Sequence, residues 1–223
     1  VRAENDGNLL VAIAEPDAVA RATAAHPGEL PRQQAAVAGW LSRRYKVAPE
    51  PVSRIVQEAW QLGQRAKLDP TLILAVMAVE SSFNPFAQSP VGAQGLMQVM
   101  TRIHDDKYQN FGGQHAAFDP LTNLRVGVQV LKDCIAQAGS VEGGLKYYVG
   151  AANLPDDGGY AAKVLGEQSH LKQVAAGKTV AVTVPQTVAR PAETPAKAAV
   201  EAAPQAKAGL ATQPVVLAAT LQR

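Results

Sequence analysis

One carboxylate in this sequence stands out because of the residues that precede it. Glu80 follows nine residues, 71–79, that carry no charge, so we expect this acid at the end of a buried helix. Desolvation and the partial negative charge at a helix C-terminus both disfavour an ionised carboxylate. An acid in such a place can act as a general acid. Judged by its position alone, Glu80 is equally compatible with a surface site that faces water.

The residues after this acid favour the catalytic interpretation. Ser81 offers a hydroxyl that can hydrogen-bond the carboxyl group or a ligand. The run SPVGAQGLMQ, residues 89–98, predicts a glycine-spaced turn that enters a short helix at Gly95–Met100. The glycines permit a close approach of the backbone, and Met97 and Gln98 place an apolar contact beside an amide. Taken singly, the glycines also fit an ordinary turn and the methionine also fits a hydrophobic core.

Helices must position these residues. Asp69 and Pro70 supply an N-cap oxygen and a proline at the first helical position, which predicts the start of a buried helix. Apolar periodicity and capping residues predict the other helices, from residue 30 to about 48, 52 to 67, 71 to 80, 122 to 138, 140 to 148 and 160 to about 171. The segment 102–120 looks irregular. The expected fold class is therefore all-α.

The distribution of aromatic residues limits where a core can form. All eleven lie between Trp40 and Tyr160, and aromatic side chains bury large apolar areas. With its closing helix the predicted domain covers residues 30–171, after an alanine-rich N-terminal arm at 1–29. The tail, 172–223, has fifteen Ala and five Pro among fifty-two residues. It cannot bury enough surface to offset its ordering entropy, so we expect it to be disordered.

Charge and composition exclude several classes of function. Residues 40–160 hold eleven acidic and eleven basic side chains, whereas nucleic-acid binding needs clustered Lys and Arg. Cys134 is the one cysteine and the four histidines are scattered, so we expect no disulfide, metal or cofactor. The longest apolar run, 72–79, is too short to span a bilayer. Because the chain begins at Val1, we expect a processed or engineered form without its export signal.

Residues 68–100, LDPTLILAVMAVESSFNPFAQSPVGAQGLMQVM, resemble the catalytic domain of the soluble-type lytic transglycosylases. These are bacterial cell-wall enzymes with a lysozyme-like fold, related to goose-type lysozyme. Two motifs match, Glu-Ser at Glu80 and Gly-Leu-Met-Gln at 95–98. The third, Ala-Tyr-Asn-Ala-Gly, matches imperfectly. Tyr148 falls on the tyrosine of this motif, but Val149 replaces its asparagine, which removes a hydrogen-bonding group from the cleft.

The resemblance implies cleavage of the β-1,4 bond between N-acetylmuramic acid and N-acetylglucosamine without hydrolysis. Glu80 would protonate the glycosidic oxygen and then take the proton of the muramoyl C6 hydroxyl, which closes a 1,6-anhydro ring. Ser81 would orient this acid, while Met97, Gln98 and Tyr148 would line the glycan cleft. An ordinary glycosidase needs two carboxyl groups, and neither matching motif contains a second one.

Two other functions stay open at this point. Asp105, Asp106 and Asp119 are the nearest acids after Glu80, and we expect them to be solvated loop acids or helix caps. If one of them instead positions water, the chain would be a muramidase similar to goose-type lysozyme. The replacement at Val149 also allows a peptidoglycan-binding or assembly protein that keeps the fold but has lost turnover.

The resemblance also indicates partners and location. The expected partner is the glycan strand of peptidoglycan, bound by a monomer, and no nucleic acid is expected. Peptidoglycan lies outside the cytoplasmic membrane, so we expect export to the periplasm. Membrane association, endo- or exo-action, and a role in wall turnover or in the assembly of an envelope-spanning machine are left open.

Overall fold

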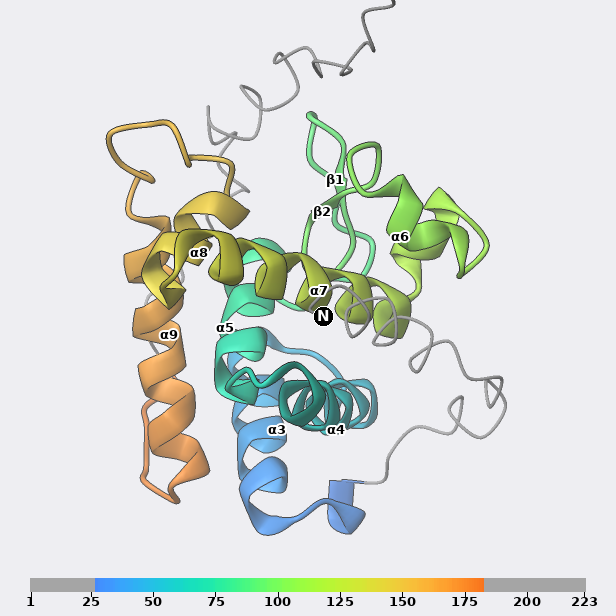
Figure 1. Cartoon of the computed structure of the whole chain (residues 1–223). Helices are drawn as coiled ribbons and strands as arrows, with labels where there is room; N and C mark the ends of the chain where they lie inside the picture. Colours follow the sequence, from blue (N-terminus) through green and yellow to red (C-terminus); the bar gives the residue numbers. More distant parts are fainter. Residues whose placement is uncertain (1–26, 183–223) are drawn as a thin grey trace, which may run out of the picture.

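A computed structural model of the 223-residue chain describes residues 27–182 (Figure 1). Helices dominate this part, so the all-α prediction is confirmed for it. Most of the predicted N-terminal arm, and the predicted C-terminal tail from residue 183, lie outside the described residues. The elements are η1 (Pro27–Glu29), α3 (Arg32–Tyr45), α4 (Pro49–Ala66), α5 (Pro70–Ser81), β1 (Ala93–Gln94), β2 (Val99–Met100), α6 (Asp105–Gln109), η2 (Gln114–Phe118), α7 (Pro120–Ala138), α8 (Val141–Tyr148) and α9 (Tyr160–Ala175).

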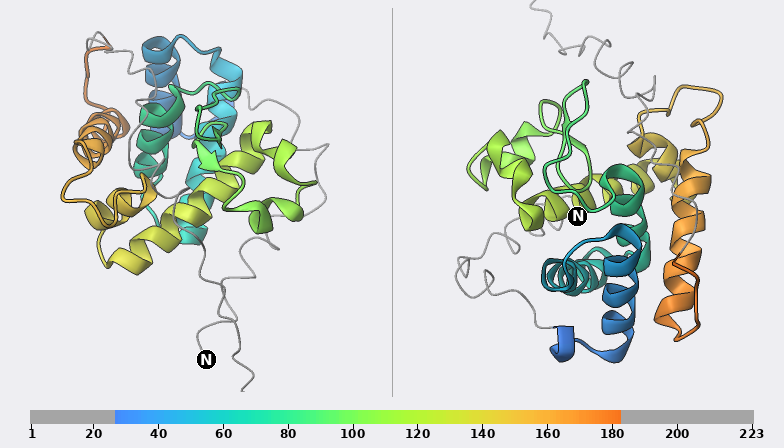
Figure 2. Two further views of the ribbon diagram at one scale, coloured as in Figure 1. Left: turned by 90° about the horizontal axis from the view of Figure 1, so that it is seen from above. Right: turned by 180° about the vertical axis from the view of Figure 1, so that it is seen from behind.

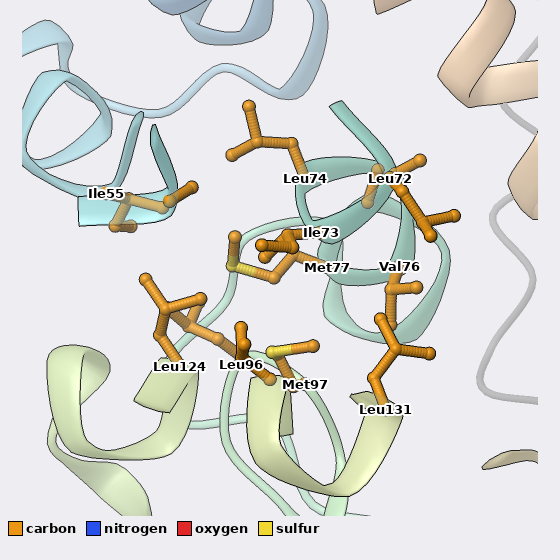
Figure 3. Close-up of a cluster of buried hydrophobic side chains, with 14 of the residues drawn as sticks. Ile55, Leu72, Ile73, Leu74, Val76, Met77, Leu96, Met97, Leu124 and Leu131 are labelled. Carbon is orange, nitrogen blue, oxygen red and sulfur yellow. The ribbon is translucent and has the colours of Figure 1, made fainter. Parts of the chain in front are cut away.

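Helix α5 runs through the centre of the core, as its uncharged sequence predicts. The Asp69 side chain accepts a hydrogen bond from the backbone N–H of Thr71 at 2.9 Å, so the predicted N-cap is confirmed. Nine of the twelve residues of α5 are buried. Figure 3 shows its side chains gathered with Leu124 and Leu131 of α7. The helix ends at Ser81, and its C-cap Ser82 has a left-handed φ of 51°.

Helices α5 and α9 lie side by side and antiparallel (Figures 1 and 2). At one end, Tyr160 at the start of α9 contacts Glu80 near the end of α5. At the other end, Lys172 of α9 pairs with Asp69 at the start of α5, with Nζ and Oδ2 3.2 Å apart. The helix α9 continues to Ala175, four residues beyond the predicted end, and it also packs on α3.

Helices α7 and α8 form a capped helical hairpin. Asp119 accepts a hydrogen bond from the N–H of Thr122 at 2.7 Å and caps α7, which begins two residues before the predicted start. Gly139, with a φ of 75°, closes α7 as predicted. Ser140 then caps α8 by accepting from the N–H of Gly143 at 3.1 Å, which confirms the predicted cap.

The prediction of a short helix at Gly95–Met100 is wrong. Strands β1 and β2 pair antiparallel on either side of the four-residue turn 95–98. Gly95 has a φ of 77° and Gln98 a φ of 47°. Both values are left-handed, and a right-handed helix cannot contain them. The segment is therefore a β-hairpin with its apolar side chains, Leu96 and Met97, turned into the core.

The segment 102–120, which looks irregular in sequence, contains two short helices. Helix α6 and the 3-10 helix η2 contact each other, and η2 also packs on α7. Tyr108 of α6 is fully buried, which gives this polar segment its place against the core. Among residues 27–182, no helix combines the length and apolar character needed to cross a membrane.

Candidate active site

Glu80 lies near the C-terminal end of α5 with 9% of its surface exposed. The hydroxyl of Tyr160 donates a hydrogen bond to its Oε1 at 2.8 Å. Tyr160 is the first residue of α9, so the antiparallel packing of α5 and α9 brings the acid and the phenol together. A phenol bonded to one carboxylate oxygen fixes the orientation of the carboxyl group. The surface position that the sequence left open for Glu80 is not the one found.

Two tyrosines near Glu80 keep their protons. Burial raises the pKa of Tyr160 well above its usual value of 10, and the nearby charge of Glu80 acts in the same direction. The pKa of Tyr148 is raised by the same two causes, again with burial first. Both hydroxyl groups are therefore hydrogen-bond donors at every pH at which a protein of this kind is assayed.

Tyr148 and Met97 are linked through the backbone. The Tyr148 hydroxyl donates to the carbonyl oxygen of Met97 at 2.7 Å. The Met97 side chain is fully buried (Figure 3) and packs on Gly127, where a Cβ would lie 2.5 Å from its Sδ. Of the two roles that the sequence left open for this methionine, the structure shows the core position. The substrate-facing roles predicted for these two residues stay predictions.

Ser81 and Gln98 fasten the loop that follows α5. The Ser81 hydroxyl lies 2.7 Å from the carbonyl oxygen of Leu96, so it ties the end of α5 to the hairpin turn. Its described hydrogen bonds go to backbone carbonyls, while Tyr160 donates to Glu80. Gln98 is buried, and its Nε2 donates to the carbonyl oxygens of Ala87 and Gly95 at 2.9 and 3.0 Å.

The five predicted site residues therefore converge, but mostly through the main chain. Glu80 and Ser81 end α5, Met97 and Gln98 form the hairpin turn, and Tyr148 ends α8. The side chains of Ser81, Gln98 and Tyr148 each hydrogen-bond the backbone of this turn or of the loop before it. Their geometry indicates a supporting frame that holds the loop beside the acid.

Two residues of this frame were missed from the sequence. The sequence predicts Tyr160 only as the start of a closing helix, whereas the structure shows that its hydroxyl hydrogen-bonds Glu80. Asn123 is fully buried at the start of α7 and accepts from the Met97 N–H at 2.8 Å. Its Nδ2 donates to the Gln94 carbonyl at 2.9 Å and to the Tyr108 hydroxyl at 3.1 Å. For Asn123, the sequence signal is an amide side chain directly before Leu124, where the apolar stripe of a buried helix begins.

The residues that bear on the alternative functions lie elsewhere. Asp119 is the N-cap of α7, as expected for a cap. Asp105 and Asp106 are exposed in the first turn of α6. Val149, which replaces the asparagine of the third motif, is buried directly after α8. Among residues 27–182, no group of three or more His, Cys, Asp or Glu side chains is placed to hold a metal ion.

Comparison with known proteins identifies the part of the chain that carries this site. Residues 58–164, just under half of the chain, match the family model described as Transglycosylase SLT domain. The match begins within α4 and ends within α9. It includes Glu80, Ser81, Met97, Gln98 and Tyr148, together with Tyr160 and Asn123.

Similar proteins include a transglycosylase of Enterobacteria phage PRD1, 35% identical over 102 residues, which are 44% of this chain and 37% of the relative. They also include two proteins named membrane-bound lytic murein transglycosylase C. That of Mannheimia succiniciproducens is 40% identical over 77 residues, 32% of this chain and 22% of the relative. That of Glaesserella parasuis is 39% identical over 77 residues, 32% and 21%. The chain thus spans between a fifth and two fifths of the length of these relatives.

Proposed function

Residues 58–164 form a transglycosylase SLT domain, and on that basis we propose that this chain is a peptidoglycan lytic transglycosylase. It cleaves the β-1,4 bond between N-acetylmuramic acid and N-acetylglucosamine without hydrolysis. The observation that carries the proposal is the buried Glu80 carboxyl group, held by the Tyr160 hydroxyl within the matched region. The family resemblance and the names of the relatives agree with this chemistry.

In the proposed mechanism one carboxyl group serves both steps. Protonated Glu80 gives its proton to the glycosidic oxygen as the bond to the muramoyl C1 breaks. The resulting carboxylate takes the proton of the muramoyl C6 hydroxyl, whose oxygen bonds to C1 and closes the 1,6-anhydro ring. The acid is protonated again at the end of the cycle, and no water is consumed. Tyr160 keeps the carboxyl group in position through both proton transfers.

The competing functions receive less support. A muramidase of the goose-lysozyme type would need an acid that positions water, and Asp119 is committed to capping α7 while Asp105 and Asp106 are exposed on α6. A binding protein without turnover would fit the loss of an amide at Val149. The buried Glu80 carboxyl group, which accepts a hydrogen bond from Tyr160, favours the enzyme.

We propose the glycan strand of peptidoglycan as the partner and a monomer as the active form. Because peptidoglycan lies outside the cytoplasmic membrane, we also propose that the chain acts in the periplasm after export. The near-neutral charge of residues 40–160 supports a partner other than nucleic acid.

Digestion of purified peptidoglycan followed by mass spectrometry of the products tests the proposal. The full chain should release muropeptides with 1,6-anhydromuramoyl ends, and Glu80→Gln should lower the rate at least about 100-fold, as expected for loss of a general acid. The matched control is Glu142→Gln, which changes an exposed acid on α8 and should keep the rate. Reducing ends in place of anhydro ends would show a muramidase. Binding of peptidoglycan without any product would show a protein that has lost turnover.

A further inference from the structure

A concave site lies at the opposite end of the α5–α9 pair from Glu80. It is a hollow of about 400 Å³, within the size range of small-ligand sites. Four helices converge on it, because its lining comes from α3, α4, the start of α5 and the end of α9. The polar and aromatic side chains of the lining are Gln33, Trp60, Gln64, Asp69, Thr71 and Lys172.

Trp60 gives this hollow an aromatic wall. Its side chain is half-buried and packs against the hydrophobic core, so the indole is held in place before any ligand arrives. The indole N–H donates to none of the residues 27–182, whereas that of Trp40 donates to the Val180 carbonyl at 3.1 Å. A fixed aromatic side chain with a polar edge suits ligands that combine an apolar face with hydrogen-bonding groups.

The polar groups of the hollow are neutral in sum. Gln33 and Gln64 are exposed, and each amide both donates and accepts hydrogen bonds. Asp69 and Lys172, which both line the hollow, form an ion pair with Oδ2 and Nζ 3.2 Å apart, so their opposite charges lie together. Paired donors and acceptors beside an aromatic wall match the hydroxyl and acetamido groups of an N-acetylated amino sugar better than they match a polyanion.

The position of the hollow fits a polymeric substrate. Pro70 and Glu80 are ten residues apart on α5, which corresponds to about 15 Å along the helix axis. Trp60, Gln64 and Pro70 lie within the matched domain, whereas Gln33 and Lys172 lie outside it. We propose that this hollow binds a segment of the glycan strand outside the catalytic site. The identity of the glycan rests on the proposed function.

Tryptophan fluorescence can test this site because the chain has two tryptophans and Trp40 is buried. The full chain carrying Glu80→Gln is titrated with the tetramer of N-acetylglucosamine. We expect a saturable change in emission that Trp60→Phe abolishes. Gln64→Ala should weaken binding about 2- to 10-fold, as for one lost hydrogen bond. Gln61→Ala, on the same helix, exposed and outside the hollow, should bind as the parent does.

The site is disproved if no change in emission depends on Trp60, or if Gln64→Ala and Gln61→Ala weaken binding equally. It is also disproved if the stem peptide of peptidoglycan changes the emission and the tetramer does not. Circular dichroism of Trp60→Phe shows that a lost response is not unfolding. Product analysis with the unmodified chain separates the two proposals. Anhydro ends without a Trp60 response would remove only the second site. A Trp60 response without any cleavage product would remove only the proposed enzyme.

Discussion

Two tyrosines near the same carboxyl group have different roles at the scale of single residues. Tyr160 donates directly to Glu80, whereas Tyr148 donates to the backbone of the hairpin turn at Met97. The motif comparison assigned Tyr148 to the site because its neighbours in sequence resemble a known pattern. It could not assign Tyr160 a role, because the bond that gives this residue its role joins positions eighty residues apart. Local sequence carries no signal for such a pair.

Tyr160→Phe removes one hydroxyl and keeps the ring. We expect turnover of peptidoglycan to fall about 10- to 100-fold, because a hydrogen bond to a charged group contributes about 1.5–3 kcal/mol. The measurement is the rate of release of anhydro-ended muropeptides at saturating substrate, with the thermal midpoint recorded in parallel. The control is Tyr147→Phe, since Tyr147 has no hydrogen bond from its hydroxyl within residues 27–182. Full turnover in Tyr160→Phe would show that the phenol does not position the acid.

At the scale of elements, helix ends were predictable where a side chain makes its own cap. Asp69 and Ser140 each accept a hydrogen bond from a backbone N–H two or three residues later, so the signal and its partner lie within one turn. The hairpin at 93–100 was not predictable in this way. Leu96 and Met97 are apolar and buried in either conformation, and the decisive features are left-handed φ values at Gly95 and Gln98. Glutamine rarely adopts a left-handed φ, so the sequence does not predict this conformation at Gln98.

The contact between the hairpin and α7 gives a test with a matched pair of glycines. Gly127→Ala places a Cβ 2.5 Å from the Met97 Sδ, and such overpacking should lower the free energy of unfolding by about 1–3 kcal/mol. Gly166→Ala changes a glycine of α9 that has nothing within 4 Å of an added Cβ. This control should leave stability unchanged or raise it by up to about 1 kcal/mol.

Urea denaturation measures both changes. Because the displaced Met97 backbone also carries the bond from Tyr148, Gly127→Ala should lower turnover as well, while Gly166→Ala should not. If the two variants are equally stable, the hairpin can shift away from residue 127 without a loss of unfolding free energy, and α7 does not fix its position.

At the scale of the whole molecule, the folded unit extends beyond the matched region. Helix α3 lies wholly outside residues 58–164, and it is joined to the late part of α9. Arg44 pairs with Glu167 at 2.9 Å, and the Tyr45 hydroxyl donates to the same carboxylate at 2.8 Å. The predicted domain, residues 30–171, includes both partners, but sequence could not pair residues more than 120 positions apart. The folded unit is thus held together in part by α3 and the end of α9, which the family match does not cover.

The buried carboxylate of Glu167 tests how much this outer brace contributes. Both Arg44 and Glu167 have side chains only 8% exposed. Glu167→Gln removes the negative charge that pairs with this cation and should lower the free energy of unfolding by about 1.5–3 kcal/mol. The control variant is Glu142→Gln. Glu142 is an exposed acid in the first turn of α8, and its loss should lower the free energy of unfolding by at most about 1 kcal/mol. Turnover of Glu167→Gln, measured well below its thermal midpoint, should stay within about two-fold of the parent, because Tyr160 lies almost two turns away on α9.

If stability is unchanged, the α3–α9 contact is incidental to the fold. If turnover collapses while the fold persists, the brace positions the acid directly and α9 transmits the change.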